Sequence, residues 1–141
     1  MPAFPLHVYN EWHHDNGFHM SGDVYLTAQG QLRADLSTST NSWGLGFTGG
    51  AIVPVIDANG NILHKWLIWP LGVDAKSIWW KRSSRTDHLE EQIDPGAAQH
   101  AEHVELWLGH MPKERWDDIL NEISDKAEDL RKLYKDIMSC L

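Results

Sequence analysis

The sequence predicts a mainly β fold in a single domain, residues 1–141, in which an antiparallel meander of about seven to nine strands precedes one long amphipathic helix. Over residues 1–110, short apolar runs alternate with tight-turn residues at roughly even spacing. Over residues 111–141, the hydrophobic period changes to that of a helix. We expect the meander to form a small β-barrel or a two-layer β-sandwich, with the helix packed against it.

The meander is organised around Ala51–Pro70, where two apolar runs flank Asn59-Gly60. A two-residue type I′ turn needs positive φ at both central residues, and Asn-Gly is the preferred pair for it. This turn would pair Ile56 with Leu63, Val53 with Trp66 and Ile52 with Leu67. One face would then carry Ile52, Ile56, Leu63 and Leu67, and the other Val53, Val55, Ile62, Trp66 and Ile68. Both faces are apolar, so we expect cover on both sides. Pro54 cannot donate to a ladder, which predicts an edge position or a bulge.

Short strands are also predicted on either side of this hairpin. They cover Leu6–Trp12, Phe18–Thr27, Leu32–Thr40, residues 43–47, Ser77–Arg82 and Val104–Leu108. The clearest alternation places Leu32, Ala34 and Leu36 on an inner face. Residues 83–101 are polar and indicate a long excursion or a ragged hairpin, with a turn at Asp94-Pro95-Gly96.

A single helix is predicted from Pro112 to the end of the chain, because proline suits the first helical position. Its apolar stripe follows steps of four and three: Trp116, Leu120, Ile123, Ala127, Leu130, Tyr134, Ile137 and Leu141. A strict heptad suits helix–helix contacts better than packing on a sheet. We therefore expect the first half of the stripe, with Ile119, to pack on the sheet. The second half, with Leu133, Tyr134, Ile137 and Met138, would form a homodimer.

Composition excludes several classes of protein. Hydrophobic residues make up 42% and charged residues 23%, which is typical of a soluble globular chain. The net charge of −8 argues against nucleic acid as a partner. No apolar run approaches the ~18 residues of a membrane helix, and the first residues lack a signal peptide pattern, which favours a cytoplasmic location. Cys140 is the only cysteine, so a disulfide framework is excluded.

The eight tryptophans indicate a binding function, because several of them fall on opposite faces of their strands and cannot share one core. The candidate ligand-binding residues are Trp66, Trp69, Trp79, Trp80 and Trp107. The predicted function is a non-catalytic binding module for a small apolar or carbohydrate-like ligand, or for a protein partner.

The nine histidines support an alternative, a small β-barrel enzyme that is cofactor-free or metal-assisted. His64 lies within the most apolar hairpin and is the candidate acid–base residue, with Asp57 or Asp23 to orient it. The candidate metal ligands are His13, His14 and His19 near the first turn and His100 and His103 near the last strand, where His110 also lies. We predict no cofactor, and a divalent metal belongs only to this alternative. Whether the chain is an enzyme stays open, with the binding module preferred.

Overall fold

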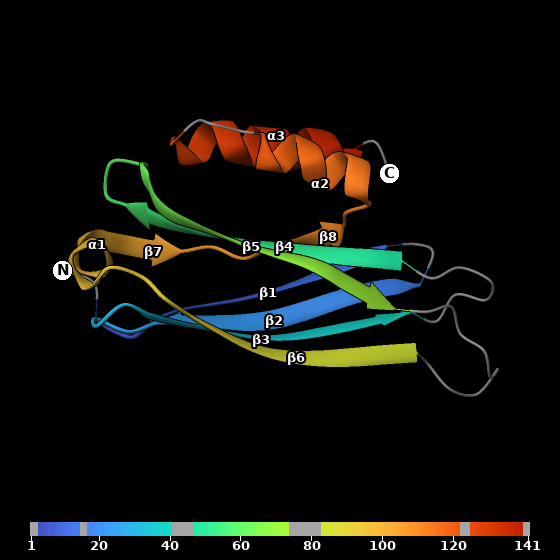
Figure 1. Cartoon of the computed structure of the whole chain (residues 1–141), viewed down its shortest axis with the longest axis horizontal. Coiled ribbons are helices and arrows are strands. Elements are labelled where there is room, and N and C mark those ends of the chain that lie inside the picture. Colours follow the sequence, from blue (N-terminus) through green and yellow to red (C-terminus); the bar gives the residue numbers. More distant parts are fainter. Residues whose placement is uncertain (1–2, 15–16, 41–46, 74–82, 122–124, 140–141) are drawn as a thin grey trace.

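The computed structural model describes residues 3–14, 17–40, 47–73, 83–121 and 125–139, and these form three layers (Figure 1). A four-stranded sheet lies on one side, a second sheet lies in the middle, and two helices cover the outer face of the second sheet. The chain is therefore mainly β, with antiparallel sheets and a helical C-terminal region, as the sequence predicts. None of the described helices is both long and apolar enough to cross a membrane.

The first sheet has the strand order β1-β2-β3-β6. Its strands are β1 (Leu6–His14), β2 (Phe18–Leu26), β3 (Gln31–Thr40) and β6 (Ser83–Gln92), all paired antiparallel. The predicted inner face of β3 is confirmed, because Leu32, Ala34 and Leu36 are buried. The other face of this sheet points away from the core and is polar.

The second sheet is built on its central strand β4 (Phe47–Asp57). One edge of β4 pairs with β5 (Ile62–Val73), and the other edge pairs with β7 (Ala101–Val104) and then β8 (Trp107–His110). Pro54 faces the break between β7 and β8, since its carbonyl accepts a hydrogen bond from the Glu105 N–H at 3.1 Å. The missing proline N–H therefore falls where the neighbouring strand is interrupted, not at a sheet edge.

The two sheets pack face to face as a sandwich, and no ladder between described strands closes them into a barrel. The core between them includes Met20, Val24, Leu36, Val53, Trp66 and Leu108. A second core lies between the middle sheet and the helices, and includes Ile52, Ile56, Trp107, Trp116 and Leu130. Both faces of the β4–β5 hairpin are thus covered, as its two apolar faces predict.

The β4–β5 register differs from the prediction near the turn. Val53 lies opposite Trp66 and Ile52 opposite Leu67, as predicted, but Ile56 pairs with Ile62 across a bulge. The bulge places Ile62 in the helix-side core and Leu63 against the sandwich core, the reverse of the predicted faces. The bulge is caused by the turn at residues 57–60. Gly60 is the one residue of this turn with positive φ, whereas a type I′ turn needs two. The chain therefore forms a type I turn followed by a glycine in place of the predicted type I′ turn.

β6 occupies residues for which the sequence indicates a long excursion. It pairs with β3 along its whole length, from Gln31 opposite Gln92 to Thr40 opposite Ser83. The sequence of β6 shows no alternation of apolar and polar residues, because Leu89 is the only apolar side chain among its ten residues. The predicted turn at Asp94-Pro95-Gly96 begins a short helix, α1 (Pro95–His100), which the Asp94 carboxylate caps through the Ala97 N–H at 3.1 Å.

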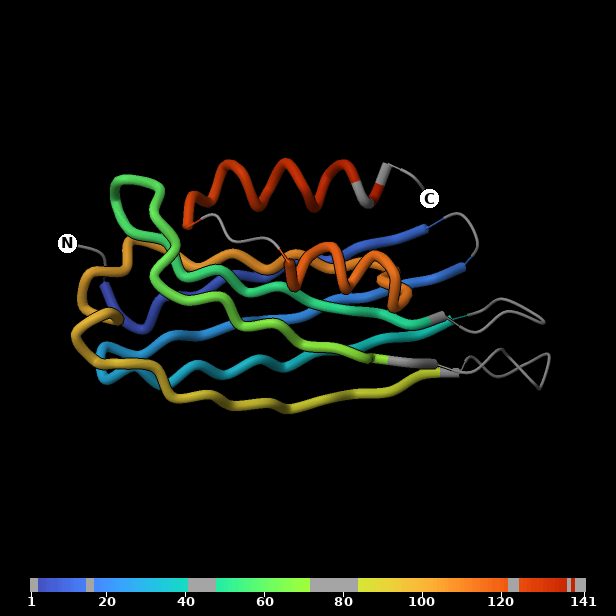
Figure 2. Tube along the Cα trace, turned by 45° about the horizontal axis from the view of Figure 1, so that its top comes forward, coloured from blue at the N-terminus to red at the C-terminus, as the bar shows by residue number. Residues whose placement is uncertain are grey.

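The predicted single C-terminal helix is wrong. The chain forms α2 (Lys113–Leu120) and α3 (Ala127–Ser139), which run in opposite directions over the same sheet face (Figures 1 and 2). The backbone between them pairs with the β4–β5 turn, where Ala127 donates to the Gly60 carbonyl at 3.0 Å. The Ala127 N–H is therefore not available for the hydrogen bond that it would make inside one continuous helix. Leu120, predicted to face the sheet, is 52% exposed.

Candidate functional site

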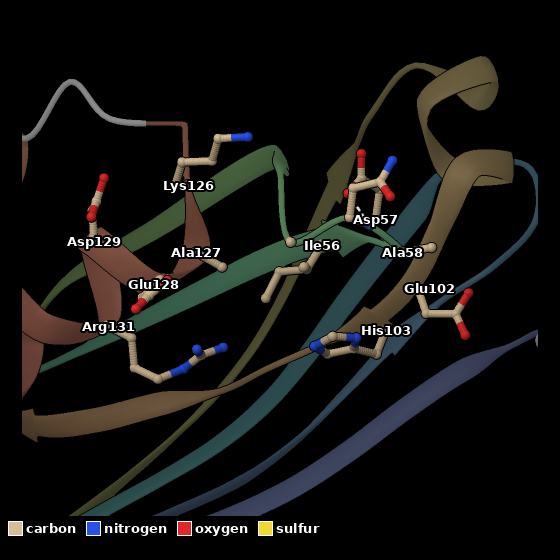
Figure 3. A pocket seen from close by; sticks show the side chains of 12 residues that line it. Ile56, Asp57, Ala58, Glu102, His103, Lys126, Ala127, Glu128, Asp129 and Arg131 are labelled. Carbon is tan, nitrogen blue, oxygen red and sulfur yellow. Dashed lines mark hydrogen bonds between the residues drawn. The ribbon is translucent and has the colours of Figure 1, made fainter.

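A cavity of about 500 Å³ opens where the β4–β5 turn, β7 and the start of α3 meet (Figure 3). We call it the turn–helix pocket. Its lining residues are Ile56, Asp57, Ala58, Asn59, Gly60, Glu102, His103, Lys126, Ala127, Glu128, Asp129 and Arg131. Figure 3 shows Arg131 and His103 reaching toward one another from α3 and β7.

The β4–β5 turn forms one wall of this pocket because Asp57 holds it closed. One carboxylate oxygen of Asp57 accepts from the N–H groups of Asn59 and Asn61, each at 2.9 Å. The hydrogen bonds from Asn61 and Asn59 outweigh the effect of burial and hold the pKa of Asp57 below its ordinary value. The turn is thereby fixed by a charged side chain that is not available to orient His64.

The start of α3 is held against this turn by backbone hydrogen bonds. The Ile62 N–H donates to the Asp125 carbonyl at 2.6 Å, and Asn61 and Lys126 form an antiparallel bridge. The Lys126 ammonium also donates to the Asn61 side-chain oxygen. The second wall of the pocket is therefore placed by the same contacts that interrupt the predicted helix.

The third wall of the pocket is β7, and Glu105, which follows this strand, links it to α3. Its carboxylate accepts from the Arg131 guanidinium at 2.6 Å, the Trp107 ring N–H at 3.0 Å and His103 Nε2 at 3.0 Å. Burial raises the pKa of Glu105, but these hydrogen bonds outweigh it and leave the pKa below its ordinary value. The Arg131 guanidinium carbon also lies 5.8 Å from the centre of the Trp107 ring, which gives a favourable cation–π interaction.

The predicted tryptophan surface is not assembled by the tryptophans that the structure describes. Trp66 is in the sandwich core, and Trp107 is buried under α3, stacked on Tyr134 at 5.4 Å. Trp69 stacks on Trp116 at 5.8 Å and donates to the Met111 carbonyl at 2.6 Å. Trp79 and Trp80, with the predicted strand Ser77–Arg82, lie outside the described residues.

His64 bridges the two sheets. It lies opposite Val55, as the predicted register requires, and its Nε2 is 2.6 Å from a carboxylate oxygen of Glu91 on β6. Asp23, the other carboxylate predicted to orient it, instead pairs with His7 at 2.7 Å. Both His64 and Glu91 are about one-third exposed, and neither lines the turn–helix pocket. The pair therefore joins the β5 and β6 edges on the side of the sandwich.

The predicted histidine clusters separate into different environments. His13 and His19 lie directly opposite each other on β1 and β2, but His14 points the other way and stacks with Trp12 and Phe18. At the other end of the chain, His103 lines the pocket, while His100 is on α1 and His110 is on β8. Burial, followed by the nearby Arg115 cation, lowers the pKa of His110.

Arg131, Glu105 and Lys126 are three of the pocket-forming residues that sequence reasoning missed. Each reads from the sequence as a solvated charge on a strand or helix surface. Their roles come from contacts over 26 residues for Arg131–Glu105 and 65 residues for Lys126–Asn61. No spacing rule within one element could have identified contacts at such separations.

Comparison of this chain with protein-family models, with curated proteins and with solved structures finds no match.

Proposed function

We propose that the protein is a non-catalytic binding module that holds a small carbohydrate-like ligand in the turn–helix pocket. One observation carries the proposal: charged side chains from three separate elements converge on a cavity of about 500 Å³. Small-molecule sites commonly measure about 300–1,000 Å³ and combine an apolar floor with a few placed polar groups. Here Ile56, Ala58 and Ala127 are the apolar residues of the lining, and polar residues outnumber them.

The charge of the lining supports a hydroxyl-rich ligand that is neutral or positively charged. Carboxylates are in the majority, from Asp57, Glu102, Glu128 and Asp129, against the cations Lys126 and Arg131. Arg131 is already paired with Glu105, which leaves little positive charge for a phosphate or a carboxylate. Carboxylates are strong hydrogen-bond acceptors for hydroxyl groups. Of the predicted ligand classes, the carbohydrate-like one fits this lining better than an apolar one.

We expect neutral saccharides or amino sugars to bind, and uronic acids to bind more weakly or not at all. The measurement is an amide NMR titration with a panel of monosaccharides and disaccharides. Glu102→Gln and Glu128→Gln should each weaken binding about 10- to 100-fold, since a hydrogen bond to a charged group contributes about 1.5–3 kcal/mol. Glu114→Gln is the matched control because this exposed glutamate lies on α2, outside the lining.

Two outcomes contradict this function. One is that no saccharide shifts the amides of the pocket at concentrations of about 1 mM. The other is that Glu102→Gln and Glu128→Gln bind as tightly as Glu114→Gln, which would place the ligand elsewhere.

The predicted homodimer remains a prediction. It assumes that the apolar side chains in the second half of the stripe would be left in water in a single copy, and this assumption is weaker than the sequence suggests. Of its four residues, Leu133, Tyr134 and Met138 pack against the helix-side core of their own chain. The Tyr134 hydroxyl donates to the Leu108 carbonyl, and burial raises the pKa of this phenol to about 12. These side chains gain less from a second copy than side chains left in water would.

A further inference from the structure

The outer face of the first sheet carries a cluster that the proposed ligand pocket does not use. Glu11 and His13 are two residues apart on β1 and point to the same, solvent-facing side. His19 lies directly opposite His13 on β2. The antiparallel ladder therefore brings two imidazoles and one carboxylate to one place, and their donor atoms all lie within 4.8 Å of one another.

The separations are close to those that a bound metal requires. Glu11 Oε2 lies 3.5 Å from His13 Nε2 and 3.8 Å from His19 Nε2. Ligands about 2.0–2.1 Å from a tetrahedral zinc ion are separated by about 3.3 Å. The donor atoms of the two imidazoles lie within 4.8 Å of one another, so side-chain rotations that bring the donors closer by at most about 1.5 Å would reach this value.

The surroundings hold the three side chains in this arrangement. The His13 and His19 rings stack at 4.2 Å between centroids, on two strands that pair over nine residues. The Tyr9 hydroxyl donates to Glu11 Oε2 at 3.2 Å, the kind of supporting contact that orients metal-binding carboxylates.

We propose that Glu11, His13 and His19 form a binding site for a divalent transition metal, with zinc as its representative. Two imidazoles and one carboxylate suit zinc, copper or nickel, whereas magnesium and calcium prefer oxygen ligands. Three protein ligands on an exposed sheet leave further coordination positions for water or for a group from outside. His13 is 64% and Glu11 51% exposed at the side chain, so the site is open to the solvent.

This site is independent of the turn–helix pocket. The C-terminal end of β1 and the β4–β5 turn lie at opposite ends of the sandwich in both views (Figures 1 and 2), and the two sites belong to different sheets. Loss of metal binding would leave the ligand proposal intact, and failure of the ligand proposal would leave the metal site intact.

The test is calorimetric titration of the full chain with zinc chloride and, separately, magnesium chloride. We expect one tight zinc equivalent and no magnesium binding. His13→Gln, His19→Gln and Glu11→Gln should each weaken the zinc site at least about 10- to 100-fold, the loss reported for removing even a supporting contact of a metal ligand. His7→Gln is the matched control. His7 lies on the same strand and the same face of the sheet as His13, but its ring pairs with Asp23 and it does not belong to the cluster.

A second readout locates the metal among the nine histidines of the chain. In an NMR spectrum of the imidazole nitrogens, zinc should shift those of His13 and His19 while those of His7 stay in place. The inference is overturned if wild type binds no zinc, if the His13→Gln and His19→Gln variants bind it as tightly as wild type, or if His7→Gln loses as much affinity as they do.

Discussion

Replacing Trp107 by alanine is expected to lower the free energy of unfolding by about 3–5 kcal/mol, the usual cost of removing a large buried aromatic side chain. Trp107 is 6% exposed and lies between β8 and α3, where it stacks on Tyr134. Its ring N–H also donates to Glu105, which holds Arg131. The substitution would therefore remove both the packing under α3 and one support of the pocket.

Trp107→Phe tests a smaller change at the same position. Phenylalanine keeps part of the apolar contact but loses the N–H donor and some of the buried ring volume, so we expect an intermediate loss of about 1–3 kcal/mol. Urea denaturation followed by circular dichroism measures both variants against wild type. A loss below about 1 kcal/mol for Trp107→Ala is incompatible with a ring enclosed between the sheet and α3.

The second large effect is expected at Gly30, in comparison with Gly60. Both glycines have positive φ, 91° and 81°, so alanine at either position costs about 1–2 kcal/mol in backbone strain. A Cβ at Gly60 would meet no atom within 4 Å, whereas a Cβ at Gly30 would overlap the backbone oxygen of Ile93. Gly30 also accepts from the Ile93 N–H at 2.8 Å, so the two segments cannot separate without losing that bond.

We therefore expect Gly30→Ala to destabilise the fold by about 1–3 kcal/mol more than Gly60→Ala, the typical cost of overpacking. The two variants share the backbone penalty, so the difference between them isolates the close approach at Ile93. Thermal unfolding of both proteins under identical conditions measures it. Equal losses would mean that residue 93 does not lie against the β2–β3 turn.

The strands that the sequence predicts well are those with an apolar face. The alternation of Leu32, Ala34 and Leu36 with polar residues predicts the inner face of β3. The two apolar faces of the β4–β5 hairpin predict that it is covered on both sides. β6 escapes prediction because it is an edge strand whose side chains are almost all polar. The pairing of β6 with β3 is a long-range property that no local pattern of residues 83–92 expresses.

The C-terminal region shows how a regular pattern can mislead. The four–three stripe from Trp116 to Leu141 fits one helix, yet it also fits two helices that each turn an apolar face to the same sheet. The choice between them depends on the β4–β5 turn, whose Gly60 carbonyl takes the N–H of Ala127. Tertiary hydrogen bonding overrides the local periodicity here.

The candidate sites are predictable to different degrees. His13 and His19 are candidate metal ligands from the sequence because they flank a turn, and the ladder brings them together with Glu11. His14, their neighbour, is separated from them by the alternation of side chains along a strand. The turn–helix pocket could not be predicted, since it exists only where α3 begins against the β4–β5 turn.

The measurement that most directly tests this account is the distance between spin labels on α2 and α3. Labels at Glu114→Cys and Asp136→Cys, in a chain with Cys140→Ser, report whether the helices turn back on each other. Antiparallel neighbours packed at about 8–10 Å place the labels within roughly 20 Å. A continuous helix over the same residues separates them by about 33 Å at 1.5 Å per residue. The short distance is the predicted result, and the long one would remove both the helical hairpin and the pocket that it forms.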